Sequence, residues 1–251
     1  MSDWVLRGLK TGIKTTRYPD APETRPGISP GLPILGQEIA GVAELCPTRA
    51  LLAENRCVTV DYRRCVHCFR CARPQDVTPA RWQPGYEWAA VEASGNLERG
   101  VFGGSLHVLV VDAGDCGACL SEIAQLNNPY YNMHRLGFFI TPTPRSADVL
   151  LVIGPVTDHM RLPLQKCYEA MPTPKRVVAV GACALSGGVF GPSFVAGSGA
   201  ADVIPVDVLV PGCPPPPLAI LHGLLVAVGR KPAAQITSSA GPAKAETVEV
   251  I

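Results

Sequence analysis

The amino-acid sequence predicts an α/β fold, in which a mostly parallel β-sheet is covered by helices on both faces. Beyond residue 105, apolar runs of strand length alternate with helix-like segments, which is the pattern of a parallel sheet. These runs are almost continuously apolar, as expected for strands that are buried on both faces. The chain has 251 residues, of which 47% are hydrophobic and 17% are charged, so we expect a sizeable buried core.

The predicted elements follow one another in a regular order along this part of the chain. Strands are predicted within residues 105–114, 137–144, 147–156, 175–184 and 206–213. Helices are predicted within residues 158–171 and 217–229. Pro163 must lie in the first turn of its helix or kink it, because proline has no N–H to donate.

Composition divides the rest of the chain into segments. The stretch "RYPDAPETRPGISPGLPILG" is rich in proline and glycine, which favours an extended segment that lies along a neighbouring surface. A connector follows the first group of cysteines, and its isolated aromatic residues are expected to pack against a neighbour. The predicted divisions are an N-terminal segment at 1–36, a small cysteine-bearing module at 37–80, the connector at 81–104, the α/β domain at 105–230 and a loose tail at 231–251.

Charge and hydropathy exclude several classes of function. The formal net charge is +1 and no basic face is evident, so nucleic acid is not an expected partner. The longest apolar runs are too short to span a bilayer, and residues 1–30 lack the features of a signal peptide. We therefore expect a cytoplasmic protein.

Ten cysteines in a cytoplasmic chain indicate metal or redox chemistry rather than structural disulfides. They fall into two groups. The first group contains Cys46, Cys57, Cys65, Cys68 and Cys71, and the second contains Cys116, Cys119, Cys167, Cys183 and Cys213.

Four cysteines of the second group directly follow predicted strands: Cys116, Cys119, Cys183 and Cys213. Ligands of open α/β sheets bind beyond the carboxyl ends of the strands, so we expect these four thiols at one sheet edge. Four thiolates are what a 4Fe–4S cluster needs, and nearby glycines allow tight turns around it. A structural zinc, a CxxC redox disulfide and unrelated buried thiols are the alternatives; we favour the cluster. Cys167 lies in a predicted helix and is interpreted as an ordinary buried thiol.

Four sequence blocks resemble one known superfamily: "VDAGDCGACLSEI", "TPRSADVLLVIGPVT", "MPTPKRVVAVGACALSGG" and "PVDVLVPGCPPPP". It contains the small subunits of nickel–iron hydrogenases, among them those of the energy-converting formate hydrogenlyase type, and the related cluster-carrying subunit of respiratory complex I. The resemblance covers about residues 105–230. It implies a flavodoxin-like domain whose 4Fe–4S cluster faces a large catalytic subunit.

Details of these blocks imply roles for further residues. The spaced pair Cys116 and Cys119 is similar to the hydrogenase type, whereas the complex I subunit carries two adjacent cysteines. By this resemblance Glu122 is a candidate for proton transfer, and Arg145 lies near the cluster. The alternatives are a carboxylate stabilised by the start of a helix for Glu122, and a surface pair with Asp148 for Arg145.

The first group resembles a bacterial two-cluster ferredoxin, with its repeated C-x₂-C-x₂-C-x₃-C-P motif. In such repeats the fourth cysteine ligates the other cluster. One cluster would then use Cys46, Cys65, Cys68 and Cys71, and all four cysteines are present. The other would need cysteines at Gly36, Ile39, Val42 and Gln75, and none is present.

The sequence therefore predicts a ferredoxin-like α+β module that keeps one complete cluster. The alternative is a zinc knuckle that uses the same residues and His67. "GIKTTRYP" is similar to the opening of polyferredoxin-type subunits in formate hydrogenlyase-like complexes. Cys57 lies outside the pattern and is interpreted as a plain thiol.

Together these patterns predict an electron-transfer subunit with two 4Fe–4S clusters. The resemblance implies three kinds of partner: a nickel–iron large subunit, an iron–sulfur subunit and membrane subunits, with the chain peripheral on the cytoplasmic face of the inner membrane. One alternative is a complex I-like or hydrogenase-related complex without nickel that reduces a quinone or another carrier. Another is a scaffold protein that is stabilised by zinc and has no redox role.

Overall fold

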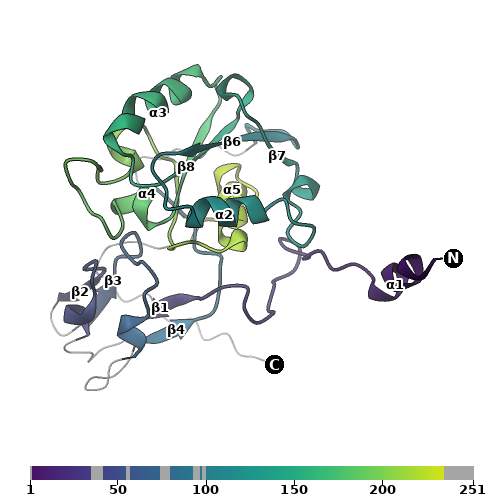
Figure 1. The fold of residues 1–251 in the computed structure, drawn as a ribbon, viewed down its shortest axis with the longest axis horizontal. Helices are drawn as coiled ribbons and strands as arrows, with labels where there is room; N and C mark the ends of the chain where they lie inside the picture. The colour runs from purple at the N-terminus through teal and green to yellow at the C-terminus, as the bar shows by residue number, and fades with distance from the viewer. Residues whose placement is uncertain are drawn as a thin grey trace.

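A computed structural model describes residues 2–34, 42–54, 57–73, 80–92, 97 and 100–234 of the chain. Figure 1 shows a larger α/β domain beside a smaller unit that contains strands β1–β4. No helix within these described ranges is both long and apolar enough to cross a membrane.

The α/β domain is built on a six-stranded sheet, with strand order β5-β10-β9-β8-β6-β7. Its strands are β5 (Ala90–Val91), β6 (Leu106–Asp112), β7 (Phe138–Ile140), β8 (Val149–Ile153), β9 (Arg176–Val180) and β10 (Val208–Val210). All neighbouring strands are parallel except β5, which pairs with β10 in the antiparallel sense. The predicted mostly parallel sheet is therefore confirmed, with an additional edge strand supplied by the connector.

Helices cover both faces of this sheet, because side chains along each strand alternate between the two faces. On β8, Leu151 and Ile153 pack into one core and Leu150 and Val152 into the other. Helices α2 (Ala118–Gln125) and α5 (Pro217–Ala227) contribute to the first core, and α3 (Asp158–Ala170) and α4 (Ala182–Ser186) to the second. Pro163 lies inside α3, beyond its first turn.

Helix α5 is buried along its whole length, and it contains one buried imidazole that has both its nitrogens satisfied. The Ala89 N–H donates to His222 Nδ1 at 3.1 Å, and His222 Nε2 lies 3.1 Å from the carbonyl oxygen of Pro232. Burial lowers the pKa of His222, so the ring is neutral at neutral pH. This residue fixes the connector and the first residues of the predicted tail to the domain.

The smaller unit consists of two antiparallel strand pairs and two short 3₁₀ helices. Strand β2 (Leu51–Glu54) pairs with β3 (Cys57–Val60), and β1 (Leu32–Ile34) pairs with β4 (Arg81–Gln83). Its 3₁₀ helices are η1 (Ala43–Leu45) and η2 (Arg70–Ala72); the α/β domain contains η3 (Met133–Leu136), η4 (Pro144–Ser146) and η5 (Ala200–Asp202). The β1–β4 pair joins the N-terminal segment to the connector, which the sequence does not predict.

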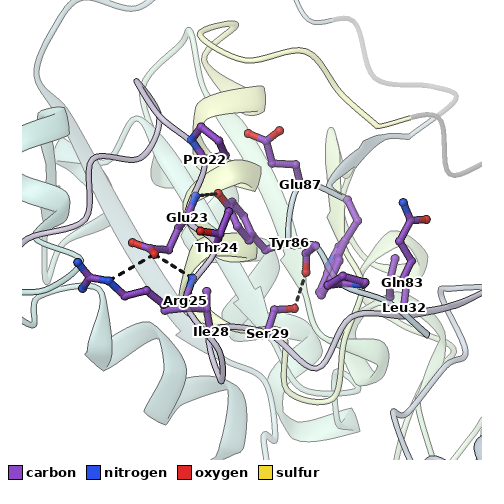
Figure 2. Close-up of a pocket in the computed structure, with 13 residues that line it drawn as sticks. Pro22, Glu23, Thr24, Arg25, Ile28, Ser29, Leu32, Gln83, Tyr86 and Glu87 are labelled. Atoms are coloured by element: carbon purple, nitrogen blue, oxygen red, sulfur yellow. Dashed lines mark hydrogen bonds and ion pairs between the residues drawn. The ribbon is translucent and has the colours of Figure 1, made fainter. Parts of the chain in front are cut away.

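The N-terminal segment begins with helix α1 (Asp3–Thr11), which projects away from the body (Figure 1), and then runs along the α/β domain. The Thr16 N–H donates to the carbonyl oxygen of Tyr130 at 2.8 Å, and Tyr18 is buried. Figure 2 shows the Glu23 N–H donating to the Tyr86 hydroxyl, at 2.7 Å, in the wall of an open cavity of about 550 Å³. The expected packing against a neighbouring surface is confirmed.

We predict that Gly223→Ala will destabilise the domain, because α5 lies unusually close to the sheet at this glycine. An added Cβ would lie 2.4 Å from the Cγ2 methyl of Val210, which is fully buried in β10. Overpacking of this kind costs about 1–3 kcal/mol of the free energy of unfolding, measurable by urea denaturation. Gly8→Ala in α1 is the matched control, since its Cβ would meet no atom within 4 Å. Equal stability of the two variants would contradict this packing.

Candidate metal centres

Four cysteines of the second group meet at the carboxyl edge of the sheet. Cys116 follows β6 and Cys119 lies at the start of α2, while Cys183 follows β9 and Cys213 follows β10. Strands β6, β9 and β10 all run in the same direction, so their carboxyl ends share one edge. The structure therefore brings these four residues to one edge of the sheet.

The thiols of this group are close enough to affect one another electrostatically. Burial raises the pKa of Cys119, and the charges of Asp115, Cys213, Cys183 and Cys116 raise it further. Burial likewise raises the pKa of Cys183 to about 11 and that of Cys213 above its ordinary value. Four thiolates at this edge would repel one another, and a cationic group between them would relieve that repulsion.

Glycines leave room for the sulfur atoms of this group. Gly181 has φ +89°, and a Cβ there would lie 2.6 Å from Cys119 Sγ. Gly188 has φ +59°, and a Cβ there would lie 2.7 Å from Cys183 Sγ. The backbone thus approaches two sulfur atoms at positions where a side chain would displace them.

Four cysteines of the first group line one small cavity in the smaller unit. The cavity walls include Cys46, Cys65, Cys68 and Cys71. Cys46 lies nineteen residues before Cys65 in the sequence, and the fold nevertheless brings it to the other three. This is the grouping that the ferredoxin-like repeat predicts.

The loop between these cysteines is held in an unusual backbone conformation. His67 and Phe69 have φ values of +50° and +59°, in the left-handed region that such residues seldom adopt. These two residues lie on either side of Cys68, between Cys65 and Cys71. The chain turns there, so that all three cysteines line the same cavity. Strained backbone of this kind is typical of functional sites.

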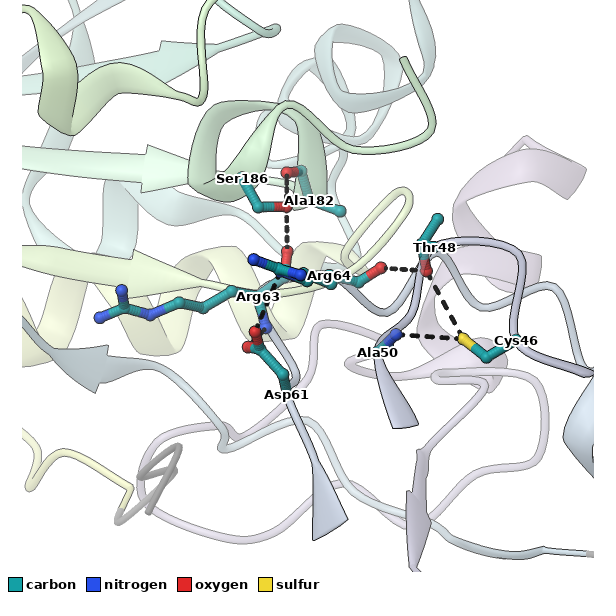
Figure 3. A network of polar contacts seen from close by, with 8 residues as sticks. All are labelled: Cys46, Thr48, Ala50, Asp61, Arg63, Arg64, Ala182 and Ser186. Carbon is teal, nitrogen blue, oxygen red and sulfur yellow. Dashed lines mark hydrogen bonds and ion pairs between the residues drawn. The ribbon is translucent and has the colours of Figure 1, made fainter. Parts of the chain in front are cut away.

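Polar groups lie beside two sulfur atoms of the first group, and those beside Cys46 are drawn in Figure 3. The Ala50 N–H donates to Cys46 Sγ at 3.2 Å, and the Thr48 hydroxyl lies 3.7 Å from the same sulfur. The indole N–H of Trp82 is buried and has no partner that meets hydrogen-bond geometry among the described residues. Burial raises the pKa of the Cys71 thiol, and the indole N–H of Trp82, which lies beside this thiol, partly offsets that rise. A thiolate at Cys71 would accept this N–H.

The residues of both groups suit an iron–sulfur centre. Each group offers four thiols, which is the ligand number of such clusters, and N–H donors to sulfur are among the features that tune them. Within the described ranges, no three His, Cys, Asp or Glu side chains are arranged to hold a single metal ion. His67 lines a different cavity from the cysteines of its own loop, so the placement of its ring gives no support to a zinc knuckle that uses it.

Glu122 and Arg145 have different positions relative to the cysteines. Glu122 lies on α2 and lines a cavity of about 350 Å³ together with Cys213, His67 and Tyr131. Burial raises the pKa of Glu122, so it binds a proton more readily than an exposed carboxylate.

Arg145 is an exposed residue of η4, shortly before β8 begins. The neighbouring Asp148 accepts the His107 N–H at 2.7 Å, which places this region near the amino-terminal edge of the sheet. The cysteines lie at the opposite edge. The structure therefore does not bring Arg145 to either cysteine group.

Several predicted positions are not part of either thiol group. Val42 is fully buried in the core of the smaller unit, and Cys167 packs half-buried on α3. Gly36, Ile39 and Gln75 lie outside the described residues, as does the side chain of Cys57. The sequence does not predict that the Trp82 indole lies beside Cys71, because that position depends on the pairing of β4 with β1.

Comparisons with known proteins relate the chain to subunits of redox complexes. Residues 116–227 match the sequence profile of the family described as "NADH ubiquinone oxidoreductase, 20 Kd subunit". The chain is 42% identical over 147 residues to the probable membrane-bound hydrogenase subunit mbhJ of Pyrococcus furiosus. That match spans 59% of this chain and 87% of the relative. The chain belongs to this family.

The chain is also similar to formate hydrogenlyase subunit 7 of Escherichia coli, with 41% identity over 125 residues. This match spans 50% of the present chain and 49% of the relative, about half of each. A chain of the membrane-bound sulfane sulfur reductase, an archaeal respiratory membrane complex, is 32% identical, with a TM-score of 0.46. It covers 50% of this chain and 70% of that one. The family profile and the two hydrogenase-complex relatives confirm the resemblance to the superfamily of hydrogenase small subunits and the complex I subunit. The family is one of oxidoreductase subunits.

We predict that the thiols of the metal-free protein will react in the order of their exposure. Cys68 and Cys116 are exposed, whereas Cys65 and Cys119 are buried, and burial raises the pKa of Cys65 to about 12. Because the thiolate is the reactive form, iodoacetamide at neutral pH will label the exposed pair first, and a higher pH will speed labelling of the buried pair. Peptide mass spectrometry measures the order, with the denatured protein as the control. Equal rates for Cys116 and Cys119 would contradict the structure.

Proposed function

We propose that the chain is an electron-transfer subunit with two 4Fe–4S clusters, in a membrane-associated nickel–iron hydrogenase complex. The observation that carries the proposal is the gathering of two separate sets of four thiols, one in each part of the molecule. Cys46, Cys65, Cys68 and Cys71 hold one cluster, and Cys116, Cys119, Cys183 and Cys213 hold the other. A bound 4Fe–4S cluster takes up and releases single electrons.

The residues of this chain hold the two centres close to one another. The Ser186 hydroxyl of α4 donates to the carbonyl oxygen of Arg63 at 2.9 Å, which joins the helix that contains Cys183 to the loop before Cys65 (Figure 3). The Arg63 guanidinium also contacts the Glu92 carboxylate at 2.7 Å, which connects the smaller unit to the connector. These contacts fix the distance over which an electron moves within the chain.

The proposed partners follow from the family and from the named relatives. They are a nickel–iron large subunit, an iron–sulfur subunit and membrane subunits, with this chain peripheral on the cytoplasmic face. The spaced pair Cys116 and Cys119 favours the hydrogenase type. The second candidate, favoured by the description of the matching family, is a complex I-like or hydrogenase-related complex without nickel.

Metal analysis of the anaerobically purified complex tests this proposal. We expect this chain to contribute about eight irons and eight sulfides, the content of two 4Fe–4S clusters, in addition to the iron of its partner subunits. Nickel in the same complex supports the hydrogenase, and its absence supports the second candidate. A colourless preparation that contains zinc and no iron would refute both.

We predict that Cys46→Ala will remove about four of the eight irons, because it deletes one ligand of one cluster. Cys167→Ala is the matched control: this thiol lies on α3, outside both groups, and its loss should leave the iron content unchanged. Iron and sulfide determination measures both variants. A Cys46→Ala protein with its full iron content would show that the fourth ligand is another residue.

We predict that Glu122→Gln will slow hydrogen turnover by the assembled complex and leave the iron content unchanged. A carboxyl whose pKa is raised exchanges its proton closer to neutral pH, and the amide cannot do so. Glu122→Asp is the control, since it keeps a carboxyl group. Turnover is measured across a range of pH, and reduction by dithionite checks that the clusters are intact. Unchanged turnover in Glu122→Gln would leave Glu122 as a structural residue.

A further inference from the structure

His67 is a buried side chain whose contacts in the structure are aromatic. It is 8% exposed, and neither ring nitrogen has a hydrogen-bond partner among the described residues. Leaving a buried polar group unpaired costs about 1–3 kcal/mol. Since the described hydrogen bonds do not explain why this ring is buried, its aromatic contacts are the remaining reason for its position.

The ring of His67 lies between two tryptophans. Its centroid is 5.6 Å from that of Trp82 and 6.1 Å from that of Trp88, and it is nearly perpendicular to both rings, at 83° and 88°. These are edge-to-face contacts within the range of favourable aromatic pairs. The three rings therefore form one continuous row.

One end of this row lies at the first cysteine group. Trp82 lines the cavity that contains Cys46, Cys65, Cys68 and Cys71, and its indole N–H lies beside Cys71. Its ring also stacks on Phe69, with centroids 4.1 Å apart, which holds it against the cysteine loop.

The other end of the row lies at the second cysteine group. The indole N–H of Trp88 donates to the carbonyl oxygen of Pro211 at 2.8 Å, two residues before Cys213. Trp88 is buried in the core of the α/β domain, so this position is well defined. His67 itself lines the same cavity as Cys213.

We propose that Trp82, His67 and Trp88 form the electron path between the two cysteine groups. This inference rests on the proposed function, because it requires a cluster in each group. In each transfer a single electron moves: one centre is oxidised by one electron and the other is reduced by one. The rings provide a packed medium between the centres and are themselves neither oxidised nor reduced. Electron tunnelling is faster through packed side chains than across a gap, and no proton needs to move.

A second connection between the groups gives a matched comparison. The Ser186 hydroxyl joins α4, which contains Cys183, to the carbonyl oxygen of Arg63, and it also lies 3.0 Å from the Ala182 oxygen (Figure 3). This route crosses a hydrogen bond and several backbone bonds. The aromatic row spans the space between the groups by ring contacts and crosses a hydrogen bond only at its end, from Trp88 to Pro211. Ser186→Ala interrupts the hydrogen-bonded route and leaves the rings in place.

The test compares His67→Leu, His67→Phe and Ser186→Ala in the intact complex. The second cluster is followed by freeze-quench EPR after the first cluster is reduced. We expect several-fold slower transfer in His67→Leu, which lacks a ring, and near-normal rates in His67→Phe and Ser186→Ala. Iron content and midpoint potentials are measured in each variant. If both equal those of the unaltered complex, neither loss of a cluster nor a change in driving force explains the slower transfer.

Other outcomes are equally decisive. Normal transfer in an iron-replete His67→Leu protein, or slow transfer only in Ser186→Ala, would overturn the proposal.

A second variant is available if His67→Leu does not hold iron. Trp88→Phe removes the hydrogen bond to Pro211 and should also slow transfer. A normal rate in Trp88→Phe would overturn the proposal. An unaltered complex without two EPR-visible centres would refute the proposed function instead. The melting temperature of the His67→Leu protein should be no lower than that of the unaltered protein, because the substitution removes two unpaired nitrogens. A lower melting temperature would indicate that His67 serves only to pack the core.

Discussion

The instability of neighbouring buried thiolates is the constraint on which both centres depend. Burial raises the pKa values of Cys65, Cys119 and Cys183, and nearby charges raise them further. Thiols held in this way stay protonated until a cation replaces the protons. Contacts elsewhere in the fold must therefore hold the sulfur atoms together, because thiolates would repel one another. It does so with the parallel sheet at one centre and with strained loop backbone at the other.

The two solutions differ in how much of the chain they require. At the sheet edge, each thiol is positioned by a buried strand, so the geometry follows from the packing of the whole domain. In the smaller unit the core is slight, and local contacts with sulfur replace it: the N–H of Ala50 and the indole of Trp82. Between the two units, the rings of Trp82, His67 and Trp88 supply the packing contacts.

The sequence predicts those features that are set by neighbouring residues. Strands β6, β9 and β10 lie in apolar runs, and the cysteines that follow them could be placed at one edge from strand direction alone. Strands β1, β4 and β5 have two or three residues each and pair with distant segments, so no local pattern reveals them. Arg145 was placed by resemblance, yet its position depends on where η4 packs. The Trp82–His67–Trp88 row likewise arises only from tertiary contacts.

The pairing of β1 with β4 means that the smaller unit is closed by segments from both sides of its cysteine loops. Residues 37–80, excised alone, would lose both strands of that pair and the indole beside Cys71. The connector then continues into β5, which pairs with β10 in the main sheet. The molecule is accordingly a poor source of a transplantable one-cluster fragment. Any graft of this centre onto another scaffold would have to carry residues from about 32 to 88.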